Sequence, residues 1–242
     1  MPRKHLVASG INKKQQLQAK IWQKLAREIK AAVKVGGPNL DANPRLKAAV
    51  DKALQNNLSR DSIERNISGS NKDPQELISL EYECYGPNGV QIIVNALTDN
   101  TNRTASNLRG YLSKLHGEIA KPNSVKIFFD NLGVIILEKL TGQSKSGVEE
   151  LVLTNELDGY IDTNEYDDSL EVITEPNGSF YKIKEVLVNN GYKVYDAAIK
   201  LVAQNKITQL DDDTKERLTR FVDSCDEDDD IQTVVTNYEE AE

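Results

Sequence analysis

The chain has 242 residues, of which 38% are apolar and 28% are charged, and its formal net charge is −8. This composition is that of a globular protein of two or three domains, and it excludes a collagen, a coiled-coil rod and a disordered chain. The charge is divided unevenly, because residues 1–80 carry 15 Lys and Arg against 7 Asp and Glu, a net of +8, whereas residues 81–242 carry 15 against 31, a net of −16. A basic part joined to an acidic part is typical of a nucleic-acid-binding module attached to other domains.

The segment from Lys13 to Lys34 predicts a helix with two chemically different faces. At 100° per residue, one arc is apolar and suits packing on a core; it contains Leu17, Ile21, Leu25, Ile29 and Ala32. A neighbouring arc gathers the cations Lys13, Lys20, Lys24, Arg27, Lys30 and Lys34. Because Glu28 is the single acid of the segment, this row lacks the alternating charges of an ordinary solvated face. The row therefore indicates a surface for a polyanion, with a merely solvated face as the alternative.

Two shorter helices complete a small helical domain. A Gly-Gly-Pro sequence at 36–38 ends the first helix, since Gly adopts the left-handed conformation and Pro cannot continue a helix. Asn43 and Pro44 then cap and begin a second helix, and Ser59 caps a third that ends at Gly69. A polar linker leads from this domain to the rest of the chain.

The remainder alternates between strands and helices. The runs Leu80–Cys84 and Val90–Leu97 flank Gly, Pro and Asn residues and predict a hairpin. A helix over Thr104–His116 follows. The later expected elements are strands Val125–Phe129 and Val134–Leu137 split by Asp130–Gly133, helix Val148–Leu157, strand Leu170–Thr174, helix Phe180–Asn189, strand Val194–Val202, helix Asp211–Cys225 and strand Ile231–Thr236.

These elements predict an α+β fold of three domains, with an N-terminal three-helix domain and two ferredoxin-like α/β domains. Because the last helix and strand repeat neither cycle completely, we expect them to return to the first α/β domain, with the second inserted in it. The expected boundaries are 1–76 for the basic helical domain, 77–130 plus 205–242 for the first α/β domain, and 131–204 for the inserted domain.

The sequence contains no phosphate-binding loop, dinucleotide-binding, zincin or nucleophile-elbow motif. His5 and His116 are the two histidines, and neither has a visible partner for general base chemistry. Cys84 and Cys225 lie outside any CxxC spacing, so we expect reduced thiols and neither a disulfide nor a zinc site. The sequence therefore nominates no catalytic residue, no cofactor and no metal site.

No apolar run approaches the ~18 residues that a membrane span needs, and the N-terminus lacks the apolar core of a signal peptide. We therefore expect a protein of the bacterial-type cytoplasm, or of the mitochondrial matrix if the chain is a mature eukaryotic one. No membrane partner is expected, and the sequence does not fix the oligomeric state, for which a monomer is favoured.

Two polar stretches of the acidic half have alternative interpretations. The stretch Asp226–Asp230 lacks the glycine and the alternating ligands of an EF-hand loop, so a solvated loop is favoured over a cation site. The stretch Asp99–Thr104 joins a strand to a helix with side chains that cap helices and bind phosphate. It is either a capped turn or a secondary contact for nucleic acid through Asn102, Arg103 and Thr104.

A series of short stretches runs in order along almost the whole chain: Lys34–Gly37, Asp41–Asn43, Leu46, Asn57–Arg65, Tyr82-Glu83, Tyr85–Gly89, Thr98–Asn100, Asn102–Thr104, Ser124-Val125 and Asp228–Asp230. Together they resemble the YebC/PmpR family, which includes the mitochondrial translational activator of cytochrome oxidase subunit I. The resemblance implies a helical domain with two α/β domains and a non-enzymatic regulator of gene expression. Family members are described as DNA-binding transcriptional regulators and as factors that act on the ribosome during translation of difficult sequences.

We therefore expect a nucleic-acid-binding regulator, and by family resemblance a DNA-binding transcriptional regulator. One alternative is a translation factor that binds the ribosome and its RNA, and another is an adaptor whose acidic α/β domains bind a basic protein. The predicted phosphate-facing residues are Arg3, Lys4, Lys13, Lys20, Lys24, Arg27, Lys30 and Lys34.

Overall fold

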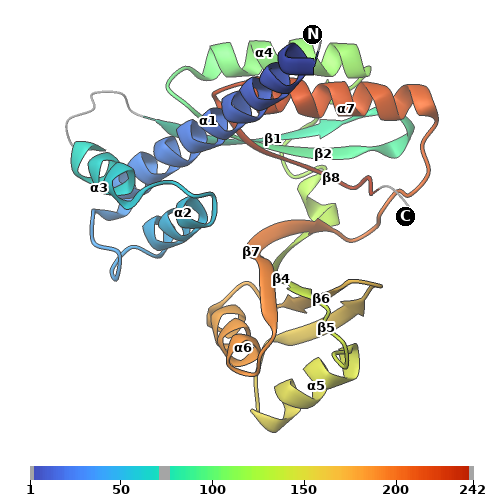
Figure 1. The fold of residues 1–242 in the computed structure, drawn as a ribbon. Helices are drawn as coiled ribbons and strands as arrows, with labels where there is room; N and C mark the ends of the chain where they lie inside the picture. The colour runs from blue at the N-terminus through green and yellow to red at the C-terminus, as the bar shows by residue number, and fades with distance from the viewer. Residues whose placement is uncertain (1–2, 71–76, 240–242) are drawn as a thin grey trace. The chain divides into compact units, whose positions relative to one another are not determined.

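The computed structural model describes the backbone of residues 3–70 and 77–239, and the side chains of these residues from 18 onward. The chain forms two compact units (Figure 1). Residues 1–125 together with 207–242 make the first unit, and residues 126–206 make the second. The second unit is therefore inserted in the first, where the sequence placed the insertion at 131–204.

The first unit begins with a domain of three helices, α1 (Arg3–Gly36), α2 (Pro44–Gln55) and α3 (Arg60–Gly69). Their apolar faces meet in one core, as the sequence periodicity predicted. Its buried residues are Leu25, Ile29, Ala32, Val33, Leu46, Ala49, Val50, Ala53, Leu58 and Ile63. Although α1 is long, none of the helices in the described part of the chain combines the length and apolar character of a bilayer span.

Local chemistry fixes the ends of these helices. The Asn43 side chain accepts a hydrogen bond from the backbone N–H of Leu46 at 3.1 Å, and the Ser59 hydroxyl accepts one from Ser62 at 3.3 Å. Both caps satisfy a donor that has no partner inside the helix. Gly37 follows α1 with φ of 82°, a conformation that glycine adopts without strain. The predicted start and stop signals are therefore confirmed.

A four-stranded antiparallel sheet of order β3-β1-β2-β8 follows in the same unit. Its strands are β1 (Ile78–Tyr85), β2 (Gln91–Thr98), β3 (Glu118–Ile119) and β8 (Ile231–Thr236). Helices α4 (Thr101–Leu115) and α7 (Asp212–Glu227) pack against each other on one face of this sheet (Figure 1). Because β8 pairs with β2, the last helix and strand complete the first α/β domain, as predicted.

The second unit is a ferredoxin-like domain with the antiparallel sheet order β5-β6-β4-β7. Its elements are β4 (Phe129–Glu138), α5 (Lys145–Thr154), β5 (Tyr160–Glu165), β6 (Ser169–Thr174), α6 (Gly178–Asn189) and β7 (Lys193–Ala203). The strands of the first sheet have the same arrangement in space, with β3, β1, β2 and β8 in the places of β5, β6, β4 and β7. The connectivity differs, because β1 comes first of its sheet in the chain, whereas β6 follows β4 and β5. The predicted fold class of one helical and two ferredoxin-like α/β domains, the second inserted in the first, is confirmed.

The prediction of two strands around Asp130–Gly133 is wrong, because β4 is one continuous strand. These four residues pair with the stretch from Val202 back to Ile199 in β7. Strand pairing over a long sequence distance thus overrides the turn preference of Asp, Asn and Gly. The residues Lys126–Phe128, expected to be part of a strand, form a 3-10 turn. The prediction also missed β3, which has only 2 residues, and β5, which is rich in polar residues.

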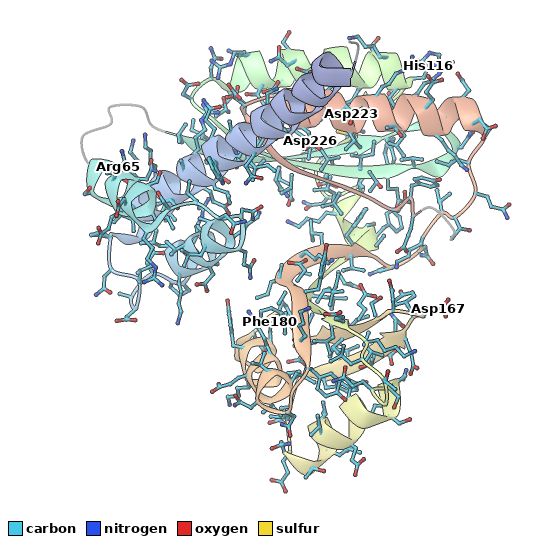
Figure 2. All side chains as sticks on the ribbon, viewed as in Figure 1. Arg65, His116, Asp167, Phe180, Asp223 and Asp226 are labelled. Carbon is cyan, nitrogen blue, oxygen red and sulfur yellow. The ribbon has the colours of Figure 1, made fainter. Side chains whose placement is uncertain are left out.

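Gly133 lies within β4 beneath Phe180 of α6, which Figure 2 labels. A Cβ atom on Gly133 would lie 2.2 Å from Thr174 Oγ1 and 2.6 Å from Phe180 Cδ2. The absence of a side chain therefore allows α6 to approach the sheet closely.

We expect Gly133→Ala to destabilise the protein by about 1–3 kcal/mol, because the added methyl group displaces Thr174 and Phe180. Gly110→Ala is the matched control, since Gly110 lies inside α4 and its Cβ would have no neighbour within 4 Å. There the change should stabilise by up to about 1 kcal/mol through helix propensity. Urea unfolding followed by circular dichroism measures both variants, and equal stability would contradict the packing role of Gly133.

Candidate nucleic-acid interface

Helix α1 presents the two faces that the sequence predicted. Leu25, Ile29 and Ala32 are at most 3% exposed and form the core side. The neighbouring side carries the described cations, which we call the cation row: Lys20, Lys24, Arg27, Lys30 and Lys34. The first four are half-buried and the last is exposed. The side chains of the other predicted members, Arg3, Lys4 and Lys13, and of His5 lie outside the described residues.

Part of the cation row meets the acidic stretch Asp226–Asp230, which we call the acidic loop. Its first two residues belong to the last turn of α7, and Figure 2 labels Asp226. Lys24 Nζ lies 3.9 Å from Asp226 Oδ1. Lys20 Nζ donates a hydrogen bond to the carbonyl oxygen of Glu227 at 3.4 Å. Burial lowers the pKa of Lys24, and the negative charge of Asp226 opposes this shift. The cations therefore face oxygen atoms of their own chain.

Asp230 is the buried centre of the acidic loop and is 2% exposed. Arg103 donates to both of its carboxylate oxygens, from Nη2 to Oδ1 at 2.8 Å and from Nε to Oδ2 at 3.0 Å. Thr104 Oγ1 donates to Oδ2 at 3.0 Å, and Arg27 Nη1 lies 3.3 Å from Oδ1. Arg27 Nη1 also donates to the carbonyl oxygen of Asp229. Burial raises the pKa of Asp230, but the hydrogen bonds from Arg103 and Thr104 outweigh it and hold the pKa below its ordinary value.

Asp228 anchors the acidic loop a second time. Its Oδ2 accepts hydrogen bonds from Asn107 Nδ2 at 3.0 Å and from the Tyr111 hydroxyl at 3.1 Å, and its Oδ1 accepts one from the backbone N–H of Asp230 at 2.9 Å. Burial, followed by the charge of Asp228, raises the pKa of Tyr111 to about 12. The prediction of a solvated loop is therefore wrong for Asp228 and Asp230, while the remaining three acids of the loop are exposed.

The turn between β2 and α4 is a well-capped turn. Asn100 Oδ1 accepts a hydrogen bond from the backbone N–H of Arg103 at 3.0 Å and begins α4. Thr104 is fully buried. The guanidinium of Arg103 is also paired with Asp99, at 2.7 Å. Of the three predicted secondary contacts, Thr104 is buried and Arg103 is bonded to Asp230 and Asp99, although part of its side chain stays exposed. Asn102 is exposed.

The remaining reactive side chains hold structural positions. Cys84 and Cys225 are free thiols in the core of the first α/β domain. Burial raises the pKa of each to about 12, so neither forms a thiolate at neutral pH. His116 ends α4 with φ of 63°, and its Nε2 lies 2.7 Å from Arg217 Nη1. Among the side chains that the structure describes, no group of three His, Cys, Asp or Glu residues is arranged to hold a metal ion.

Comparisons with known proteins cover nearly the whole chain. Residues 3–73 match the TACO1/YebC protein N-terminal domain, and residues 77–238 match the TACO1/YebC second and third domain. The chain is 55% identical to a protein of Ureaplasma urealyticum and 53% identical to one of Malacoplasma penetrans, over 99% of each chain, and both are named probable transcriptional regulatory protein. The crystal structure of a conserved hypothetical protein from Aquifex aeolicus is 30% identical, with a TM-score of 0.76, and the match covers 93% of this chain and 91% of that chain.

We expect Asp230→Asn to destabilise the protein by about 2–3 kcal/mol at pH 7, because Arg103 loses the charge of its buried partner. Asp229→Asn is the matched control, since it removes the same charge from an exposed neighbouring side chain and should change stability by less than about 0.5 kcal/mol. Urea unfolding of both variants measures the difference.

The effect of Asp230 should also depend on pH. Because its pKa is lower in the folded protein than in the unfolded chain, Asp230 contributes stability above the unfolded value of about 3.9, and this contribution is lost as the pH falls through the lowered folded value. The stability gap between the wild type and D230N should be widest above about pH 5 and should narrow in acid. A gap of constant size down to about pH 3 would contradict this role.

Proposed function

We propose that this chain, which belongs to the TACO1/YebC family, is a non-enzymatic regulator of gene expression that binds nucleic acid through the cation row of α1. The observation that carries the proposal is the row itself, which runs along one side of a helix whose other side is a hydrophobic core. Cations held in a fixed line on a rigid element suit the regularly spaced phosphates of a nucleic acid.

The length of the row supports this assignment. At 1.5 Å per residue, the distance along α1 from Lys20 to Lys34 is about 21 Å, comparable to about six base-pair steps of a duplex. We propose that Arg3, Lys4 and Lys13 extend the row and that Asn102 and Arg103 make a secondary contact. Such contacts position a protein on nucleic acid without reading its sequence.

The proposed ligand is duplex DNA in the bacterial cytoplasm, because the relatives from Ureaplasma and Malacoplasma are named as transcriptional regulatory proteins. Phosphate contacts of this kind would also suit ribosomal RNA. Crosslinking of the intact protein in cells distinguishes the two ligands. Recovery of promoter DNA supports transcriptional regulation, and recovery of ribosomal RNA replaces it with a role in translation.

We expect the triple variant Lys20→Gln, Lys24→Gln and Lys30→Gln to bind DNA more weakly and with less dependence on salt. The slope of log K against log salt should fall by about 0.9 for each phosphate contact removed. Arg27 is left unchanged because it contacts Asp230. Fluorescence anisotropy with a labelled duplex measures the slope.

The matched control is Arg45→Gln, Lys47→Gln and Arg60→Gln, which removes three exposed charges from the α2 and α3 region of the same domain. Its salt slope should stay close to that of the wild type. Equal slopes for the two triple variants would contradict the assignment of binding to α1.

A further inference from the structure

We propose that the acidic loop is an intramolecular competitor for the cation row, so that nucleic acid occupies the row fully only when α1 leaves the loop. The inference rests on the proposed function and adds a mode of regulation to the same surface. It starts from the contacts that α1 makes within its own chain.

The acidic loop supplies oxygen atoms to three cations on successive turns of α1. Lys20 donates to the backbone carbonyl oxygen of Glu227, and Lys24 lies beside the carboxylate of Asp226. Arg27 donates to the carbonyl oxygen of Asp229 and to the carboxylate of Asp230. The side chains of Lys24 and Arg27 are consequently only 15% and 24% exposed. A phosphate group needs the same donor atoms from the same direction, so the loop and a polyanion cannot both use them fully.

The loop has anchors in the α/β domain that do not depend on its contacts with α1. Asp228 is bonded to Asn107 and Tyr111, and Asp230 is bonded to Arg103 and Thr104, all from α4. These contacts satisfy the two central carboxylates without help from the helical domain. Release of the cation row therefore requires α1 to move, while the loop keeps its place.

The contact between α1 and the loop has the properties of a reversible one. The helical domain and the first α/β domain have separate hydrophobic cores, built from different residues. Between them lies a groove of about 370 Å³ lined by Lys20, Lys24, Asp226 and Gln232, among others. The buried Nε2 of Gln232 has no hydrogen-bond partner among the described residues, and the Asp226 side chain is 57% exposed. The long ion pair is open to solvent on its Asp226 side, and the amide beside it is unsatisfied, so this part of the attachment is weak and is screened by salt.

The test compares two double variants of the full chain. Asp226→Asn with Asp229→Asn removes two exposed charges from the loop and leaves its anchors intact. Asp213→Asn with Glu216→Gln is the control, because it removes two charges from α7 whose side chains are 66% and 62% exposed, more than two helical turns away from the loop. Both variants have the same net charge, so a general change of charge affects them alike.

Fluorescence anisotropy with a labelled DNA duplex gives the affinity of each variant. At about 50 mM salt, the loop variant should bind about three- to tenfold more tightly than the wild type, and the gain should shrink at about 200 mM. The control variant should bind much as the wild type does. Equal affinities of the loop and control variants would contradict competition by the acidic loop but would leave the proposed function intact. Absence of DNA binding by every variant and by the wild type would contradict both.

A second measurement does not depend on removing acids. Fluorescent labels on Ala19→Cys in α1 and Thr219→Cys in α7 report the separation of the two helices through energy transfer, since both positions are exposed and the two native thiols are buried. Transfer should fall when the duplex binds. Unchanged transfer in the DNA-bound protein would overturn the inference, because α1 would then bind DNA without leaving the loop.

Discussion

The buried carboxylate of Asp230 joins parts of the first unit that are far apart in the sequence. A buried charge is stable only when it is paired and hydrogen-bonded, and the planar guanidinium of Arg103 supplies two donors in the geometry that a carboxylate needs. Thr104 supplies a third donor. Because Arg103 and Thr104 belong to the α/β domain itself, the further contact with Arg27 can be lost without leaving the carboxylate unpaired.

This division of contacts gives ion pairs and hydrogen bonds a part in the attachment of the helical domain. Each of the two domains in the first unit buries its own apolar residues, so that neither needs the other to complete a core. What joins them in the described structure includes ion pairs and hydrogen bonds at the edge of a groove. Such contacts respond to salt in the same sense as contacts with phosphate. The acidic loop and the proposed ligand therefore compete for the cation row through interactions of the same kind, and salt weakens both.

The sequence predicted what depends on local chemistry. The caps at Asn43 and Ser59 and the stop at Gly37 follow from side chains within a few residues of the backbone groups that they serve. The stretch Asp130–Gly133 was misread because its pairing with β7 is a contact between distant segments. The anchoring of the acidic loop was missed for the same reason, since Asp230 is 127 residues from Arg103 and 203 from Arg27. No periodicity in a single sequence reports such pairs.

These contacts give the uneven charge of the chain a second role, because the acidic part of the chain can compete with outside anions for the basic part. An acidic segment held beside a cationic helix acts at a constant effective concentration, which does not fall when the protein is diluted. A polyanion that engages only one or two cations gains too little free energy to displace it, whereas a ligand with many closely spaced phosphates engages the whole row. The acidic loop therefore converts a general attraction to anions into a preference for long, densely charged ones, and the selectivity resides in the competitor as much as in the cations.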